Sequence, residues 1–486
     1  MKLNLSKTLE KDIPKIIADY LSPDNGERAH AAFQFTINGV TYPFVRNLNF
    51  AALPDPPRQR RYSMLGALFL ARPGDLMFFY QSDPQWRKDD IDSRRGLRGI
   101  YVVSSAPFRG TDNIKDPTTG YTMLGNCPNC HISRSTLSAK CPKCRKEYPT
   151  VNLQSRSDPY HNLLLSLRIE IEPLIVFERA ISDERAYADM SDTGMIWIGR
   201  HDNQMGAGKG SSVRQLLPEE AIKITRMMLS EPGQKISFPQ KVDYKFEKKE
   251  ILNEDGTKVT DLELRPVNQT IKIVAQEHML NFDIARSIDN PNSSFVKELG
   301  NEFGINEMEY VSSEFPWGYT AGESDFIVAF KNETGRYKVF VMEFKRDWID
   351  DATMIQVSLY NRWVVQTICQ FATPKIENIT VYPIVVGRRL KKDTVRPRPY
   401  SFTASYNSGV SVKADVKSPQ FIDYTPEDEF TKGGIIYAAS LKYKNKSIGI
   451  PQIDWIPEQG IITSQVERDW VINTSWVIAK KKTKSS

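Results

Sequence analysis

The chain of 486 residues is long enough for two or three domains, and its 40% hydrophobic and 26% charged content is that of a globular protein. No stretch approaches the roughly 18 apolar residues of a membrane span, and the amino terminus lacks the apolar segment and cleavage site of a secretion signal, so we expect a cytoplasmic protein. The net charge of +6 permits a polyanionic partner without requiring one.

The first region, residues 1–235, is expected to be rich in strands. Strand-like runs follow the turn at 73–74 and occupy residues 97–107, 163–177 and 195–199. A helix is expected to begin at Pro218, because proline followed by two glutamates is typical of a first helical turn. Several strands that close on themselves with short helices predict a small β-barrel.

Four of the five cysteines lie in one short segment, at about residues 121–150. They form two C-x-x-C pairs, Cys127 with Cys130 and Cys141 with Cys144. Two such pairs supply the four thiolates of a tetrahedral structural zinc site, which leaves no open position for catalysis. The alternative is a redox pair of dithiols, and contact of this zinc ribbon with DNA stays an open question. Cys369, alone in an expected helix, is expected to be core.

The first region resembles the PUA-like superfamily, in particular its EVE and YTH branches, through PGDLMFFY at 73–80, RGIYVVS at 98–104 and RQLLPEEA at 214–221. The resemblance implies a pocket that receives an extruded, often modified base between aromatic walls. It implies these residues: Phe79, Tyr80, Trp86 and Trp197 for stacking, Asn49 and Asp83 for the base edge, and Arg94, Arg95 and Arg98 for flanking phosphates. The competing interpretation is that strand aromatics are core.

Residues 236–270 read as a charged linker, in which Asp255 and Gly256 indicate a hairpin turn. From 271 to 410 the pattern is a helix at 291–304, strands at 324–330 and 338–347, a helix at 352–371 and a strand at 380–387. This order predicts a mixed sheet flanked by helices. Together the two regions predict an α+β or α/β multidomain chain.

Three residues of the second region have the chemistry of a phosphodiesterase. Glu343 and Lys345 are two apart on one expected strand, so both face the same side of the sheet, and hairpin pairing can bring Asp325 beside them. Two carboxylates can hold Mg²⁺ with open water positions, and a neighbouring lysine can orient the nucleophile or stabilise developing charge. The alternative is an exposed ion pair on an edge strand.

These residues, in the runs SDFIV and MEFK, resemble the PD-(D/E)xK nuclease superfamily over roughly residues 290–390. Gln356 and Tyr360 match the Q-x-x-x-Y helix motif of some of its branches and lie on one helix face. The resemblance implies that an acidic residue of the first helix assists metal binding, with Glu298 the first candidate and Glu302 the second. Ser324 replaces the proline that often precedes the first aspartate.

A reader joined to a nuclease predicts a restriction-type endonuclease of double-stranded DNA that depends on a modified base, uses Mg²⁺ for catalysis and carries structural Zn²⁺. Two alternatives stay open: an endonuclease specific for an unmodified sequence, and a non-catalytic nucleic-acid-binding protein. A homodimer is expected at least on DNA, because cutting both strands commonly takes two such sheets. Residues 411–486 either complete the nuclease sheet or form an accessory layer.

Overall fold

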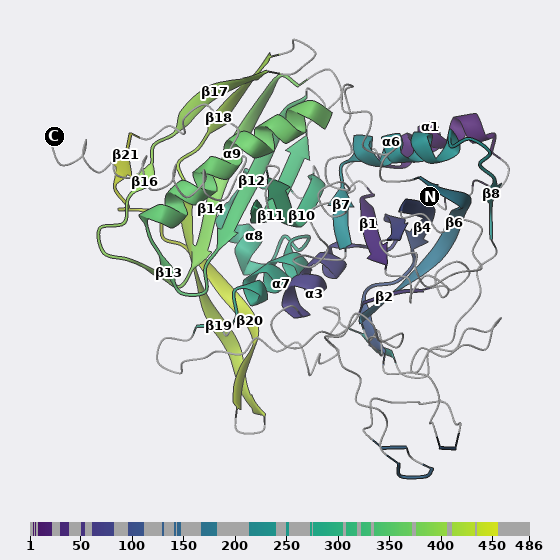
Figure 1. The fold of residues 1–486 in the computed structure, drawn as a ribbon. Helices are drawn as coiled ribbons and strands as arrows, with labels where there is room; N and C mark the ends of the chain where they lie inside the picture. Colours follow the sequence, from purple (N-terminus) through teal and green to yellow (C-terminus); the bar gives the residue numbers. More distant parts are fainter. Residues whose placement is uncertain are drawn as a thin grey trace.

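The computed structural model describes residues 3, 5, 8–21, 30–37, 50–53, 61–81, 96–110, 129–130, 140–141, 143–146, 167–181, 213–239, 249–251, 273–274, 276–304, 308–317, 322–331, 335–371, 376–405, 411–432 and 435–454. They form two mixed sheets that lie side by side, each covered by helices (Figure 1). The mixed α and β content and the mixed sheets agree with the predicted fold class.

The first sheet belongs to the amino-terminal half of the chain. Its main path runs in the order β7 (Val213–Leu216), β1 (Ala32–Ile37), β3 (Leu76–Gln81), β4 (Gly96–Val103), β6 (Leu167–Ile181), β5 (Phe108–Gly110) and β9 (Lys249–Ile251). β2 (Phe50–Leu53) and β8 (Ile236–Ser237) also pair with β6. β1 and β3 are parallel, and the other pairings in this sheet are antiparallel.

Helices cover both faces of this sheet, so its central strands β3 and β4 are buried along almost their whole length. The short η1 (Glu10–Asp12) leads into α1 (Ile13–Leu21), which packs with α6 (Pro218–Leu229) on the face that carries Phe78. α3 (Arg61–Leu70) covers the opposite face, which carries Phe79. This alternation along β3 follows from the two-residue period of a strand. Figure 1 shows α1 and α6 side by side along one edge of the half.

One expectation for the first half is not confirmed and another is changed. The strand path is open: no pairing joins its end strands β7 and β9 in the described part of the chain, so closure into a barrel is not confirmed. The segment 236–270, interpreted as a linker, contributes the strands β8 and β9 to the first sheet. The expected strand at 195–199 and the turn at Asp255 lie outside the described residues.

The second sheet begins with the antiparallel strands β10 (Met308–Trp317), β11 (Gly322–Lys331) and β12 (Arg336–Phe344). α9 (Asp351–Phe371) then crosses one face, and β14 (Asn378–Gly387) returns parallel to β12. The first half of β14 pairs with β18 (Ser411–Val416), and its last residues pair with β19 (Gln420–Lys432). β17 (Tyr400–Ser405) and β20 (Ile435–Asn445) are the outer partners of β18 and β19.

The described residues after 410 therefore complete the second sheet, which decides between the two roles left open for them. Two small sheets flank its main body: β13 (Trp348–Ile349) pairs with β15 (Arg389–Leu390), and β16 (Arg396–Pro397) pairs with β21 (Gln452–Ile453). Among the described residues, no helix has the length and apolarity needed to cross a membrane.

α7 (His278–Ser287) and α8 (Ser294–Leu299) cover the face of the second sheet opposite to α9. The expected helix at 291–304 is shorter than predicted, because Gly300 adopts a φ of +75° and ends it. The helix begins at Ser294, where the Ser293 side chain caps it by accepting from the Val296 N–H at 3.3 Å. Phe295 of this helix and Phe303 beyond it are both buried.

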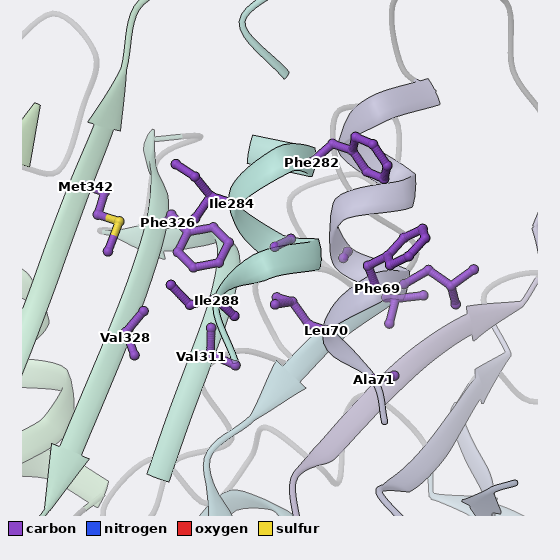
Figure 2. Close-up of a cluster of buried hydrophobic side chains, with 14 of the residues drawn as sticks. Phe69, Leu70, Ala71, Phe282, Ile284, Ile288, Val311, Phe326, Val328 and Met342 are labelled. Carbon is purple, nitrogen blue, oxygen red and sulfur yellow. The ribbon is translucent and has the colours of Figure 1, made fainter. Parts of the chain in front are cut away.

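The two halves share one hydrophobic core rather than meeting across a linker. Figure 2 shows Phe69 of α3 beside Phe282 of α7, with Val311, Phe326, Val328 and Met342 of the second sheet on the other side of α7. The two rings meet edge to face, with 5.2 Å between centroids. At the rim of the core, Arg72 Nε donates to Asp289 Oδ2 at 2.7 Å. Apolar contact on this scale fixes the two sheets relative to each other.

Candidate active site

The predicted carboxylates and lysine meet at one end of β11 and β12. Phe326 and Phe344 point into the core beneath α7, so the neighbouring positions Asp325 and Glu343 point to the α9 side of the sheet. Lys345 directly follows β12, and its N–H donates to Val386 O of β14 at 2.8 Å. Local strand alternation and the parallel β12–β14 pairing thus place all three side chains together.

Glu343 is the centre of a hydrogen-bonded group. Its Oε1 accepts from Lys345 Nζ at 2.6 Å and from Gln356 Nε2 at 3.0 Å. Gln356 also contacts the hydroxyl of Tyr360, one turn further along α9. Glu343 is 3% exposed, so these contacts lie in a site from which most water is excluded. The helix motif is therefore connected to the strand motif by direct contacts.

Asp325 is held from two directions. Its Oδ2 accepts from the Phe344 N–H at 2.6 Å, across the β11–β12 pairing. Its backbone carbonyl accepts from Asn281 Nδ2 of α7 at 3.0 Å, and Asn281 Oδ1 in turn accepts from Ser313 Oγ of β10 at 3.0 Å. A fixed backbone and one fixed carboxylate oxygen leave the orientation of Asp325 little freedom.

The charges of the site work against one another in the absence of a cation. Burial and the neighbouring Glu343 raise the pKa of Asp325 well above its usual range, and burial also raises that of Glu343. Burial tends to lower the pKa of Lys345, but the surrounding carboxylates outweigh it and raise this pKa above its ordinary value. One lysine thus faces two carboxylates, and Glu343 disfavours the ionisation of Asp325.

A divalent cation fits this donor set. Glu343 Oε2 is buried and has no hydrogen-bond partner within the described part of the chain. A buried carboxylate oxygen without a partner is costly, and coordination to a hard cation would satisfy it. A cation would also relieve the repulsion that raises the Asp325 pKa.

The structure places a different acid beside the site from the one that the resemblance implied. Glu277, just before α7, lies 3.7 Å from Lys345 Nζ through its Oε1, and its Oε2 accepts from the Arg346 N–H at 3.3 Å. Glu298 instead accepts from the Asn445 N–H of β20 at 2.7 Å, and Glu302 lies 2.9 Å from Lys338 Nζ, near the start of β12. Glu298 and Glu302 are thus replaced by Glu277 as the helix-borne candidate.

Sequence reasoning missed Glu277 and Asn281 because it took residues 291–304 as the first helix of this region. The segment before it, QEHMLNFDIARS, forms α7 and buries Phe282 and Ile284. The apolar spacing of this segment was a usable signal for a helix. Its contact with Asp325 depends on packing between elements, which has no counterpart in the local pattern.

Three of the four predicted zinc ligands gather in the first half. The Sγ atoms of Cys130, Cys141 and Cys144 all lie within 4.8 Å of one another and could hold a metal ion. Arg145 adopts a φ of 59°, and its N–H donates to Cys141 O at 2.9 Å, which closes the turn. Cys127 lies outside the described residues. Cys369 is buried in α9, as predicted.

The predicted base pocket is corrected at three positions. Phe79 is 1% exposed and lies 5.2 Å from the Phe35 ring and 4.7 Å from the Tyr101 ring, so it belongs to the core. Tyr80 and Arg98 are each 2% exposed. The physical reason is that helices cover both faces of this sheet, which buries both alternating sets of side chains. The other candidates lie outside the described residues: Asn49, Asp83, Trp86, Arg94, Arg95 and Trp197.

Comparison with known proteins adds no relative: no family model matches the chain, and no curated protein matches it. The candidate site is therefore defined by the geometry of this chain alone.

Proposed function

We propose that this protein is a metal-dependent endonuclease of the PD-(D/E)xK kind, which hydrolyses phosphodiester bonds of double-stranded DNA. The observation that carries the proposal is the group formed by buried Glu343 with half-buried Asp325 and Lys345, joined through Glu343 to Gln356 of α9. An exposed ion pair on an edge strand would need only one carboxylate and one lysine. This site has two carboxylates beside its lysine, and one buried carboxylate oxygen, Glu343 Oε2, has no hydrogen-bond partner among the described residues.

Each residue has a role that its contacts support. Asp325 and Glu343 would hold Mg²⁺, which when bound supplies positive charge and Lewis acidity beside the scissile phosphate. Lys345 orients the attacking water and offsets the charge that develops on the phosphate. Gln356, held by Tyr360, fixes Glu343 Oε1 so that Oε2 faces the cation. Glu277 holds Lys345 from the other side.

The thiol cluster would serve stability rather than chemistry. We propose that Cys127 completes a four-thiolate shell with Cys130, Cys141 and Cys144 around Zn²⁺. A closed shell of this kind leaves no position for substrate. Release of the ion by a chelator is therefore expected to lower stability before it affects cleavage chemistry.

The first half would select the DNA. With Phe79, Tyr80 and Arg98 buried, recognition of a modified base by a PUA-like pocket depends on Trp86, Trp197 and the remaining candidates of this region. Modification dependence therefore remains part of the proposal, with an unmodified target sequence as its alternative. The choice between them belongs to the substrate experiment.

The test compares Mg²⁺-dependent cleavage of two matched plasmids, one unmodified and one carrying 5-methyl- or hydroxymethylcytosine. Wild type is expected to cut one of them, while Glu343→Ala and chelation of Mg²⁺ abolish cutting. Glu302→Gln is the matched control, because this exposed acid pairs with Lys338 away from the site and should cut normally. The plasmid that is cut identifies the mode of recognition. Absence of cleavage with either plasmid would favour the non-catalytic binding protein.

A further inference from the structure

The small sheet beside the candidate site carries an exposed aromatic residue stacked on an arginine. Trp348 of β13 is 44% exposed, and Arg389 Cζ of β15 lies 4.0 Å from the centroid of its ring. The two strands pair in parallel, with Trp348 opposite Arg389. The stacking on Arg389 holds the exposed indole of Trp348 at the surface, where it can contact a ligand.

The guanidinium of Arg389 is fixed but not saturated. Its Nε donates to Asp347 Oδ1 at 2.8 Å and its Nη2 donates to Asp347 Oδ2 at 2.7 Å. An arginine has five N–H donors, so two bonds to Asp347 leave three donors without a partner in the described structure. A guanidinium with a fixed orientation and free donors is well suited to a phosphate group.

Other cations accompany this pair. Lys391 is 56% exposed and pairs with Asp350, and Lys392 is exposed at the turn that follows β15. Arg388 pairs with Asp423 at the end of β14. This basic run was unassigned by the sequence pattern, and the structure brings it to the strand ends that carry the candidate site.

The pair lies close to the candidate catalytic residues. Trp348 follows Lys345 by three residues, which limits the separation of their Cα atoms to roughly 10 Å. That is about three steps of the 3.4 Å rise per nucleotide along a DNA strand. The pair therefore lies within reach of the DNA backbone on either side of a phosphate at the candidate site.

We propose that Trp348, Arg389 and Lys392 form a clamp for the DNA backbone that flanks the scissile phosphate. Arg389 and Lys392 contact phosphates, and Trp348 packs against the adjoining sugar. Such contacts set the register of the duplex without reading its sequence. The proposal rests on the proposed function, since it assigns this surface to the substrate of the same site.

The first experiment measures binding of a fluorescent DNA duplex by the full-length Glu343→Gln protein in Ca²⁺, so that cleavage does not interfere. Arg389→Ala and Lys392→Ala are each expected to weaken binding about eightfold at 0.1 M salt and to lower the salt-dependence slope by about 0.9, the loss of one phosphate contact. Trp348→Ala is expected to weaken binding without changing this slope.

Arg336→Ala is the matched control, because Arg336 also pairs with an acid, Glu377, but at the opposite end of β12. Its duplex affinity should equal that of the parent. Lys392→Ala guards against misfolding, since no ion pair of Lys392 is present among the described residues. Unchanged affinity of both Arg389→Ala and Lys392→Ala, or a preference of the parent for RNA over the DNA duplex, would overturn the clamp.

A cleavage assay separates this inference from the proposed function. Should wild type cut DNA while the Arg389→Ala and Lys392→Ala forms bind and cut as well as wild type, the clamp alone is wrong. Should no DNA be cut but the clamp variants lose binding, the nuclease proposal fails, and the three residues remain contacts for a DNA backbone without a scissile phosphate. A parent protein that binds no DNA overturns both.

Discussion

At the scale of single residues, the candidate site is strained by its own charges. Asp325 and Glu343 share a buried space in which burial and mutual repulsion raise the Asp325 pKa well above its usual range. A raised carboxyl pKa means that the folded protein binds this proton more tightly than the unfolded chain does. Protonated Asp325 therefore contributes to the free energy of unfolding at low pH. This contribution is lost as the pH rises from about 3.9, the unfolded value, through the pKa of Asp325 in the folded protein.

Asp325→Asn should therefore stabilise the metal-free protein at neutral pH, because the amide removes a buried negative charge and can still accept from the Phe344 N–H. In thermal melts with EDTA at pH 7.5, the variant should unfold about 1 °C above wild type for each kcal/mol gained, given the unfolding entropy of a chain of 486 residues. Mg²⁺ should raise the midpoint of wild type and leave that of the variant unchanged. Equal Mg²⁺ shifts in both proteins would contradict the assigned cation site.

Gln356 offers a test of the link between helix and strand. Gln356→Leu removes the Nε2 donor to Glu343 Oε1 but keeps the size of the side chain. Because a hydrogen bond to a charged group contributes about 1.5–3 kcal/mol, kcat should fall about tenfold to a hundredfold with little change in duplex affinity. Tyr360→Phe, which removes the hydroxyl beside Gln356 but keeps the Gln356–Glu343 hydrogen bond, should have a smaller effect. A Gln356→Leu protein with normal kcat would exclude this role.

The sequence was sufficient to place two pairs of these residues, one on a strand face and one on a helix face. Strand alternation fixes the common face of Glu343 and Lys345, and the four-residue spacing of Gln356 and Tyr360 fixes a common helix face. Both are local rules. Glu277 could not be found in this way, because its place beside Lys345 depends on how α7 packs against the sheet. The choice of Glu298 failed for the same reason, since α8 packs against β20 and turns this carboxylate to Asn445.

At the scale of elements, α3 of the first half lies against α7, whose Asn281 donates a hydrogen bond to the backbone of Asp325. Gly66 of α3 approaches Asn281 so closely that a Cβ atom at this position would lie 2.7 Å from Asn281 Oδ1. Asn281 in turn donates to the Asp325 carbonyl and accepts from Ser313. A change in α3 can thus reach the candidate site through one side chain.

Gly66→Ala is expected to displace the Asn281 amide, lowering stability by about 1–3 kcal/mol, the usual cost of overpacking. Cleavage should fall further than stability explains, because Asp325 loses its backbone anchor. Adding Asn281→Ala makes room for the new methyl group and should restore part of the stability but none of the activity. Wild type, the two single variants and the double variant form a double-mutant cycle. Denaturant unfolding and single-turnover cleavage of these four proteins measure the coupling energy between Gly66 and Asn281. Additive effects on stability would show that the two residues are not coupled.

Elements with strong periodicity were predictable, whereas their ends and partners were less so. The helix at 352–371 and the strand at 380–387 agree with α9 and β14 within one or two residues. The end of α8 at Gly300 was missed. Either Gly300 or Gly304 could end the helix in the sequence, and only the structure shows that Gly300 adopts the positive φ. The pairing of β19 with β14 joins residues far apart in sequence and has no local signature.

At the scale of the whole molecule, we expect the two halves to unfold as one cooperative unit, because they share a hydrophobic core. Phe282 is 1% exposed and contacts Phe69 across the boundary between them. Phe282→Ala should cost about 3–5 kcal/mol, the usual loss for a buried phenylalanine. Calorimetry should show the two halves still unfolding together at a lower temperature. Two separate transitions in wild type would contradict the shared core.

The same rigidity bears on how the proposed enzyme would cut. A duplex selected by the first half would lie at a fixed position relative to Asp325 and Glu343, because α3 and α7 pack through buried rings and the Arg72–Asp289 ion pair. Cleavage should then fall at one distance from the recognised site, to within a nucleotide. Phe282→Ala, which loosens this contact, should broaden the distribution of cut positions, whereas Arg336→Ala should leave it unchanged. Sequencing of the product ends measures this directly, and an equally broad distribution in wild type would mean that recognition and cutting are not rigidly connected.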